Sequence, residues 1–171
     1  MKLAELLARQ LTQSRDFCEK LLDSFKTPED WTHQIAPGTN HALWFAGHMA
    51  ASDNFFIGML DPAKKRNLDD WSGHFGMGSQ PTSDPDDYPP VAEVLDAMRE
   101  RRTVLLELLG KMSDGDLAKA TPPDVAGFCP DYAAIFQMGT WHEGLHAGQI
   151  TMIRRALGHK PVFSPETAEA S

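Results

Sequence analysis

The run from Trp141 to Gln149 carries two histidines, His142 and His146, that are one helical turn apart. In an α-helix, residues i and i+4 lie on the same face with their Cβ atoms roughly 5–6 Å apart, so two imidazoles are able to reach one metal ion. The spacing therefore predicts a pair of metal ligands. A metal site inside a helical bundle also takes ligands from a facing helix.

Two further histidines are candidates for the third ligand. His48 lies in the middle of an apolar helical pattern, and His41 lies two turns earlier on the same face. Three neutral imidazoles leave a four-coordinate ion one open position, which is typical of catalytic sites. Zinc is the first expectation for such a site, while nickel, iron and manganese stay open because imidazole suits several divalent ions.

The chemistry expected of such a site follows from its charge. A divalent ion lowers the pKa of a bound water or of a coordinating thiol, and so provides a nucleophile at neutral pH. Gln149 shares a helical face with the two histidines and is a candidate for orienting a ligand or a bound water. Glu143 points about 100° away around the helix and is a candidate general base. Trp44 and Trp141 are expected to line the site.

Three alternatives compete with this interpretation. The segment from His142 to His146 matches the H-E-x-x-H motif of zinc metallopeptidases, with Glu143 as the general base and Glu166 as a third ligand. However, no strand pattern indicates the sheet that such peptidases use, and Glu166 lies beyond the last predicted helix. A di-iron carboxylate site needs a second E-x-x-H motif, which the sequence lacks. A non-catalytic bundle with a structural ion stays open.

Four stretches carry apolar residues at intervals of three and four, which predicts four helices that each bury one face. They cover residues 2–25, about 40–60, 91–112 and 131–157. Thr39 or Asn40 is expected to cap the second helix, and Gly158 is expected to end the fourth. Because no stretch alternates as a strand does, the sequence predicts an all-α four-helix bundle.

Residues 61–89 are rich in glycine and proline, and no regular element is predicted there. A connection of this length is able to run the full height of a bundle, so the helix order need not be simply up and down. Trp71, His74, Phe75 and Met77 are apolar enough to pack back over the fold. We expect one domain over residues 1–163, followed by a flexible tail at 164–171.

Composition excludes several classes of function. The 171 residues include 16 Lys and Arg against 24 Asp and Glu, a net charge of −8, which argues against a nucleic-acid partner and against binding to anionic membranes. The two cysteines, Cys18 and Cys129, form no disulfide framework. No apolar run reaches the roughly 18 residues of a membrane span, and charged residues near the amino terminus interrupt what would have to be the apolar core of a signal peptide. We expect a cytoplasmic protein.

Three motifs taken together resemble the DinB-like (YfiT-like) family, and the resemblance runs over most of the chain. They are Pro37-Gly38-Thr39-Asn40 with Trp44 and Gly47-His48, then His142-x-x-x-His146-x-Gly148-Gln149, and finally Arg154-Arg155-Ala156-Leu157-Gly158-x-x-Pro161. The resemblance implies a bundle of the up-up-down-down type and frequent homodimers. It also implies a divalent metal site formed by His48, His142 and His146, and all three positions are matched.

The same resemblance implies a type of chemistry. Characterised relatives include transferases and isomerases that use low-molecular-weight thiols, so we expect a metal-dependent transferase or hydrolase. In such an enzyme, the ion activates a water or a low-molecular-weight thiol for reaction with a small-molecule substrate. The family name refers to induction by DNA damage. The acidic balance of this sequence gives no support for DNA binding.

Overall fold

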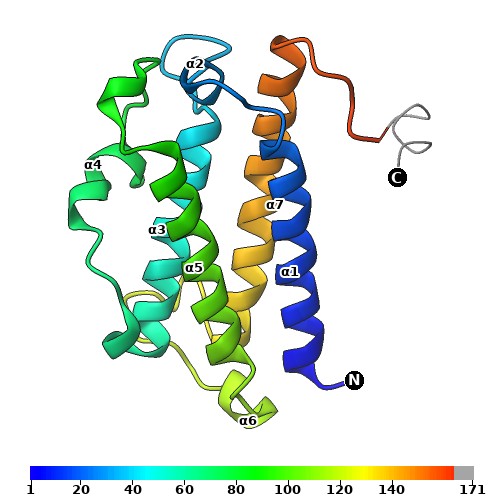
Figure 1. The fold of residues 1–171 in the computed structure, drawn as a ribbon. Helices are drawn as coiled ribbons and strands as arrows, with labels where there is room; N and C mark the ends of the chain where they lie inside the picture. The colour runs from blue at the N-terminus through cyan, green and yellow to red at the C-terminus, as the bar shows by residue number, and fades with distance from the viewer. Residues whose placement is uncertain (164–171) are drawn as a thin grey trace.

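The apolar intervals in the sequence become the buried faces of four long helices that lie side by side (Figure 1). The computed structural model describes residues 1–163, so the predicted tail at 164–171 lies outside the described residues. The long helices are α1 (Leu3–Leu22), α3 (Ala42–Leu60), α5 (Val91–Leu109) and α7 (Tyr132–Ala156). The all-α prediction is confirmed. Over residues 1–163, none of the helices combines the length and the apolar character needed to cross a membrane.

The ends of the helices differ from the prediction by a few residues. The cap of α3 is His41, whose Nδ1 accepts a hydrogen bond from the Trp44 amide at 3.0 Å, and the expectation of Thr39 or Asn40 was wrong. Asp131 caps α7 by accepting a bond from the Ala134 amide, and Gly158 follows its last turn with a φ of +85°. A left-handed φ of this kind favours glycine, as the sequence predicted.

The four long helices run in the order up, down, down, up. In Figure 1, α1 and α7 run towards one end of the bundle, and α3 and α5 run towards the other. This order corrects the up-up-down-down order that the resemblance implied. The link 23–41, with the short α2 (Pro28–Trp31), crosses one end and sends α3 back down. The link 110–131, with α6 (Asp114–Leu117), crosses the other end and sends α7 up.

The crossover of residues 61–89 runs the height of the bundle, so α5 starts at the same end as α3 and lies parallel to it (Figure 1). The sequence predicted no regular element in this crossover, but the structure has four short helical turns there. These are η1 (Pro62–Lys64), η2 (Asp69–Trp71), α4 (Ser72–Phe75) and η3 (Pro85–Asp87). Asp61 and Asp84 each cap one of the turns that begin with proline. The caps stabilise these turns locally. The turns are too short for their apolar residues to repeat at helical spacing, so the sequence pattern did not reveal them.

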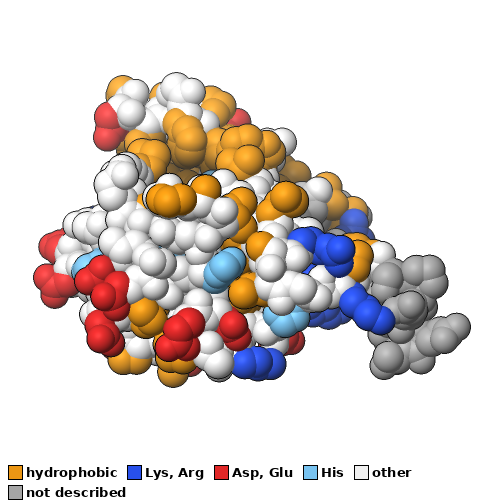
Figure 2. Space-filling model, turned by 90° about the horizontal axis from the view of Figure 1, so that it is seen from above, with side chains coloured by type: hydrophobic (Ala, Val, Ile, Leu, Met, Phe, Trp, Pro, Cys, Tyr) orange, Lys and Arg blue, Asp and Glu red, His pale blue; other side chains and the backbone are white. Residues whose placement is uncertain are grey.

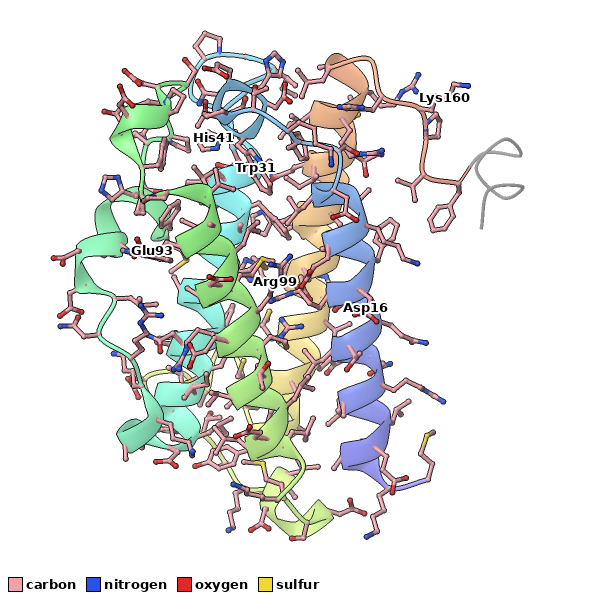
Figure 3. All side chains as sticks on the ribbon, in the orientation of Figure 1. Asp16, Trp31, His41, Glu93, Arg99 and Lys160 are labelled. Atoms are coloured by element: carbon pink, nitrogen blue, oxygen red, sulfur yellow. The ribbon has the colours of Figure 1, made fainter. Side chains whose placement is uncertain are left out.

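The crossover packs back onto the bundle as predicted, but through only part of the expected set. Trp71 and Phe75 are buried, whereas the Met77 side chain is 96% exposed. At the α2 end, the buried His41 ring meets Tyr88 edge to face, with 4.9 Å between the ring centroids. Figure 3 shows His41 beside Trp31 of α2 at this end. The crossover and α2 therefore close the end of the bundle from which α3 starts.

The core consists of two apolar clusters with charged residues between them. The upper cluster, at the α2 end, includes Cys18, Leu21, Phe45, Met49, Met98 and Ile150. The lower cluster, at the α6 end, includes Leu11, Ile57, Leu105, Leu109, Ile135 and Phe136. Between them lie four buried charged side chains that bond to one another, one from each long helix. These four are Arg15, Asp53, Arg102 and Glu143, and we call them the charged layer.

Candidate metal centre

Three imidazoles from two facing helices meet beside the upper cluster. His48 comes from the second turn of α3, and His142 and His146 come from adjacent turns of α7. The Nε2 atom of His142 lies 3.1 Å from that of His48 and 3.0 Å from that of His146. The three ligand atoms all lie within 4.8 Å of one another, so the predicted set meets at one point.

The spacing of these atoms suits a tetrahedral ion. With metal–nitrogen bonds of 2.0–2.1 Å, two ligands at tetrahedral angles are about 3.3–3.4 Å apart. The observed Nε2 separations of 3.0 and 3.1 Å are only slightly shorter. The geometry therefore fits three ligands of one ion with a fourth position open.

Hydrogen bonds at the opposite ring nitrogens set the orientation of two of the histidines. His48 Nδ1 lies 2.7 Å from the carbonyl oxygen of Phe75, and His146 Nδ1 lies 2.9 Å from Oε1 of Gln149. Because both partners are acceptors, each Nδ1 carries the proton and each Nε2 keeps its lone pair for a metal. Asn40 in turn donates to the same Gln149 oxygen at 3.2 Å. Gln149 thus orients the His146 ring, while its contact with a bound water stays a prediction.

The protonation of the cluster is set mainly by burial. Burial lowers the pKa of His48 and of His146 below the ordinary histidine value. The pKa of His142 is lowered to about 4, mainly by burial and to a smaller extent by the neighbouring His146 and His48. A lowered pKa means that each ring is neutral near pH 7. The neutral imidazole is the form that binds a metal ion.

Aromatic packing encloses the cluster on one side and leaves it open on another. The Trp44 ring stacks on His48 with 4.4 Å between centroids, so Trp44 lines the site as predicted. Trp141 instead is 60% exposed. His48 and His146 are buried, but His142 is only half-buried, so the cluster reaches solvent on the α7 side.

Comparison with protein families agrees with the motifs and the fold. The family model described as the DinB superfamily matches residues 10–150. The chain belongs to the DinB superfamily. The matched span contains all three histidines of the cluster as well as Gln149. A comparison with curated proteins finds no match.

His41, the reserve ligand, is not part of the cluster in this DinB superfamily member. Its Nδ1 accepts the Trp44 amide hydrogen at the start of α3, so this nitrogen is already used. Burial lowers the pKa of His41 to about 4, and the ring is therefore neutral at physiological pH. His41 acts as a helix cap, and His48 is the third member of the cluster.

Glu143 is turned away from the histidines into the charged layer. Its side chain is fully buried, and its two carboxylate oxygens accept bonds from Arg15, from Arg102 at 2.9 Å and from Ser14 at 2.7 Å. It is not a member of the cluster of ligand atoms. A general base needs a carboxylate beside the bound water, and the Glu143 carboxylate is held by two guanidinium groups instead. This placement argues against the predicted catalytic role.

The charged layer is neutral as a whole and linked across all four helices. Arg102 makes two bonds to Asp53, at 2.9 and 3.1 Å, and Arg15 reaches the same carboxylate at 3.1 Å. Burial alone would lower the pKa of the Arg102 guanidinium, but the Asp53 and Glu143 carboxylates outweigh it and raise that pKa. Arg102 therefore stays charged, and each charged side chain of the layer has an opposite partner within it.

Sequence reasoning predicted the role of Gln149 but missed the charged layer, Asn40 and the Phe75 carbonyl. None of Arg15, Asp53 and Arg102 was singled out from the sequence as a buried charge. A usable signal was present, since each of these residues stands at a core position between apolar residues of its helix. Asn40 and the Phe75 carbonyl had no signal of this kind, because they reach the site only through tertiary contacts.

We expect Glu143→Gln to reduce the stability of the fold strongly. The variant leaves two buried guanidinium groups with one carboxylate, and breaking a buried ion pair in this way costs about 3–5 kcal/mol. Urea unfolding followed by circular dichroism measures the loss.

Glu19→Gln is the matched control, because Glu19 pairs with Arg99 at the surface. Its expected cost is about 0–1 kcal/mol. A Glu143→Gln protein with the stability of the wild type would contradict the structural role of Glu143 and reopen its role as a base.

Proposed function

We propose that this DinB superfamily protein is a divalent-metal-dependent enzyme acting on a small molecule. His48, His142 and His146 hold the ion, with Zn²⁺ as the first expectation and Ni²⁺ or Fe²⁺ as alternatives. When bound, the ion supplies a Lewis acid that activates a water or a low-molecular-weight thiol for transfer or hydrolysis. The single observation that carries the proposal is the convergence of three Nε2 atoms, with hydrogen bonds at Nδ1 orienting the rings of His48 and His146.

The donor set and its exposure favour a catalytic over a structural ion. Structural zinc sites are closed by four protein ligands, whereas the described residues bring only three ligand atoms to this point. The half-buried His142 gives the cluster partial contact with solvent. Gln149 and the Phe75 carbonyl hold protons at the two Nδ1 atoms, which keeps the ligand lone pairs directed at the ion.

A thiol is a suitable co-substrate at such a site. A free thiol is mostly protonated at neutral pH, and coordination to a divalent ion converts it to the nucleophilic thiolate. The cysteines of the chain do not supply this group, because burial raises the pKa of the Cys18 thiol to about 12 and also raises the pKa of Cys129. The thiol therefore comes from a small molecule in solution.

The metallopeptidase alternative loses its main support. Its general base would be Glu143, which lies in the charged layer between Arg15 and Arg102. Its third ligand would be Glu166, which lies outside the described residues. A non-catalytic bundle with one bound ion remains the main alternative, because the same three histidines would hold either a catalytic or a structural ion.

The metal content of the protein tests the proposed ligands. Protein prepared without a histidine tag should bind close to one Zn²⁺ per chain, and His48→Ala, His142→Ala and His146→Ala should each bind only a small fraction of that, because two imidazoles hold an ion weakly. Elemental analysis after dialysis against Zn²⁺ measures the stoichiometry. His33→Ala, which removes a histidine outside the cluster, should leave it unchanged. A wild-type protein that binds no divalent ion would refute the proposal.

A further prediction concerns the thiol. Co²⁺-loaded protein should develop a thiolate-to-cobalt absorption band when glutathione or cysteine is added, because the open position accepts the sulfur. S-Methylglutathione is the matched control, since it cannot form a thiolate. A bound ion without any thiolate band would remove the thiol from the proposal and leave water as the nucleophile.

We also propose that the protein forms a homodimer through the outer face of α7. Trp141, Leu145 and Met152 are 60%, 52% and 58% exposed along this face. Added Cβ atoms at Gly144 and Gly148 would meet nothing within 4 Å, so a second helix has room to approach. Figure 2 shows hydrophobic side chains gathered along one side of the molecule. Large exposed apolar patches are typical of protein interfaces.

Leu145→Lys should shift the protein from dimer to monomer, because a buried charge opposes the contact. Analytical ultracentrifugation at micromolar concentration measures the mass. Met77→Lys is the control, since Met77 is 96% exposed on the crossover. A monomeric wild type would contradict the dimer without affecting the metal site.

A further inference from the structure

The crossover contributes directly to the metal centre through its α4 segment. The carbonyl oxygen of Phe75, the last residue of α4, lies 2.7 Å from His48 Nδ1 and accepts its proton. This bond fixes both the tautomer and the orientation of the ring. Histidine ligands with such a partner are better bases and lose less freedom when they bind a metal. One ligand of the site is therefore oriented by a segment 27 residues away in sequence.

Gly47 lets this segment come close to α3. A Cβ atom added at Gly47 would lie 2.4 Å from Cγ and Cδ1 of the Phe75 ring, far inside van der Waals contact. The ring has no room to retreat, because Phe75 is fully buried and meets Trp71 edge to face with 5.3 Å between centroids. The absence of a side chain at position 47 thus determines how closely the Phe75 carbonyl approaches the neighbouring His48.

A second contact joins the crossover to the same face of α3. Trp44 donates from its indole Nε1 to the Ser79 hydroxyl at 2.8 Å, and its ring stacks on His48. Trp44, Gly47 and His48 stand at positions i, i+3 and i+4, which places them on one face of α3. Each of the three therefore contacts either the crossover or the histidine that the crossover orients.

We propose that the docked crossover is a positioning element of the metal centre, in which Phe75 acts through His48 and Gly47 provides the space for it. Crossover docking raises metal affinity, and metal binding in turn stabilises the docked crossover. The two effects are equal by linkage, since a segment that favours the metal-binding state must be favoured by the metal. The inference rests on the proposed three-histidine site but not on the reaction.

The test compares two glycine-to-alanine changes on the same helix. Gly47→Ala pushes the Phe75 ring and carbonyl away from His48. Gly58→Ala is the matched control, because its Cβ would meet only the flexible Lys65 side chain, at 2.9 Å from Cδ. Co²⁺ titration followed by visible absorption measures both affinity and coordination geometry. We expect Gly47→Ala to bind Co²⁺ about 10–100-fold more weakly with an altered spectrum, and Gly58→Ala to match the wild type.

A measurement on the wild type decides the case even if Gly47→Ala does not fold. Hydrogen exchange of peptides covering residues 72–79 should slow when Zn²⁺ is added, while exchange at α6, at the far end of the bundle, should not change. Unchanged exchange at 72–79, or a folded Gly47→Ala protein with wild-type Co²⁺ affinity and spectrum, would overturn the inference and leave the metal site standing. A wild type that takes up neither ion would refute the proposed function instead.

Discussion

The fold depends on the neutralisation of four charges in the middle of the bundle. Burying an isolated charge is costly, so two guanidinium groups and two carboxylates are stable there only when they meet. Each of the four comes from a different long helix. The Arg102 side chain of α5 bonds to all three other helices, through Asp53 of α3, Glu143 of α7 and the Leu11 carbonyl of α1. A shift of one helix along its axis would break several of these bonds. The charged layer therefore fixes the relative heights of all four helices.

The charged layer also determines how closely the histidines of the cluster approach one another. Glu143 is the residue next to His142, and Asp53 follows His48 by five residues, a rise of about 7.5 Å along the helix. When the arginines hold Glu143 and Asp53, α3 and α7 are locked at the height at which His48 faces His142. The tightly packed upper cluster holds the backbones, and hydrogen bonds from Gln149 and Phe75 then orient the rings. The charged layer thus fixes the positions of the helices, and the hydrogen bonds at the cluster fix the orientation of the imidazole rings.

The sequence predicted much of the molecule because the relevant signals are local. The periods of apolar residues indicated all four long helices, and the i, i+4 spacing of His142 and His146 indicated the ligand pair. His48 was preferred as the third ligand from its place on an apolar face, and the structure brings it to the cluster. The short turns of the crossover escaped prediction because three or four residues carry no helical period. The cap at His41 escaped because histidine is an uncommon capping residue.

Sequence alone determined the elements and the donor atoms, because helical periodicity and ligand spacing are properties of neighbouring residues. Tertiary structure decided which buried polar groups meet. Glu143 belongs to the H-E-x-x-H motif and was a candidate base, but the tertiary structure places it in an ion-pair network with Arg15 and Arg102. Tertiary structure also brought the Phe75 carbonyl to His48, since a backbone oxygen has no identity in the sequence. The physical reason is that burial and electrostatic pairing depend on contacts between distant segments, which one-dimensional spacing does not encode.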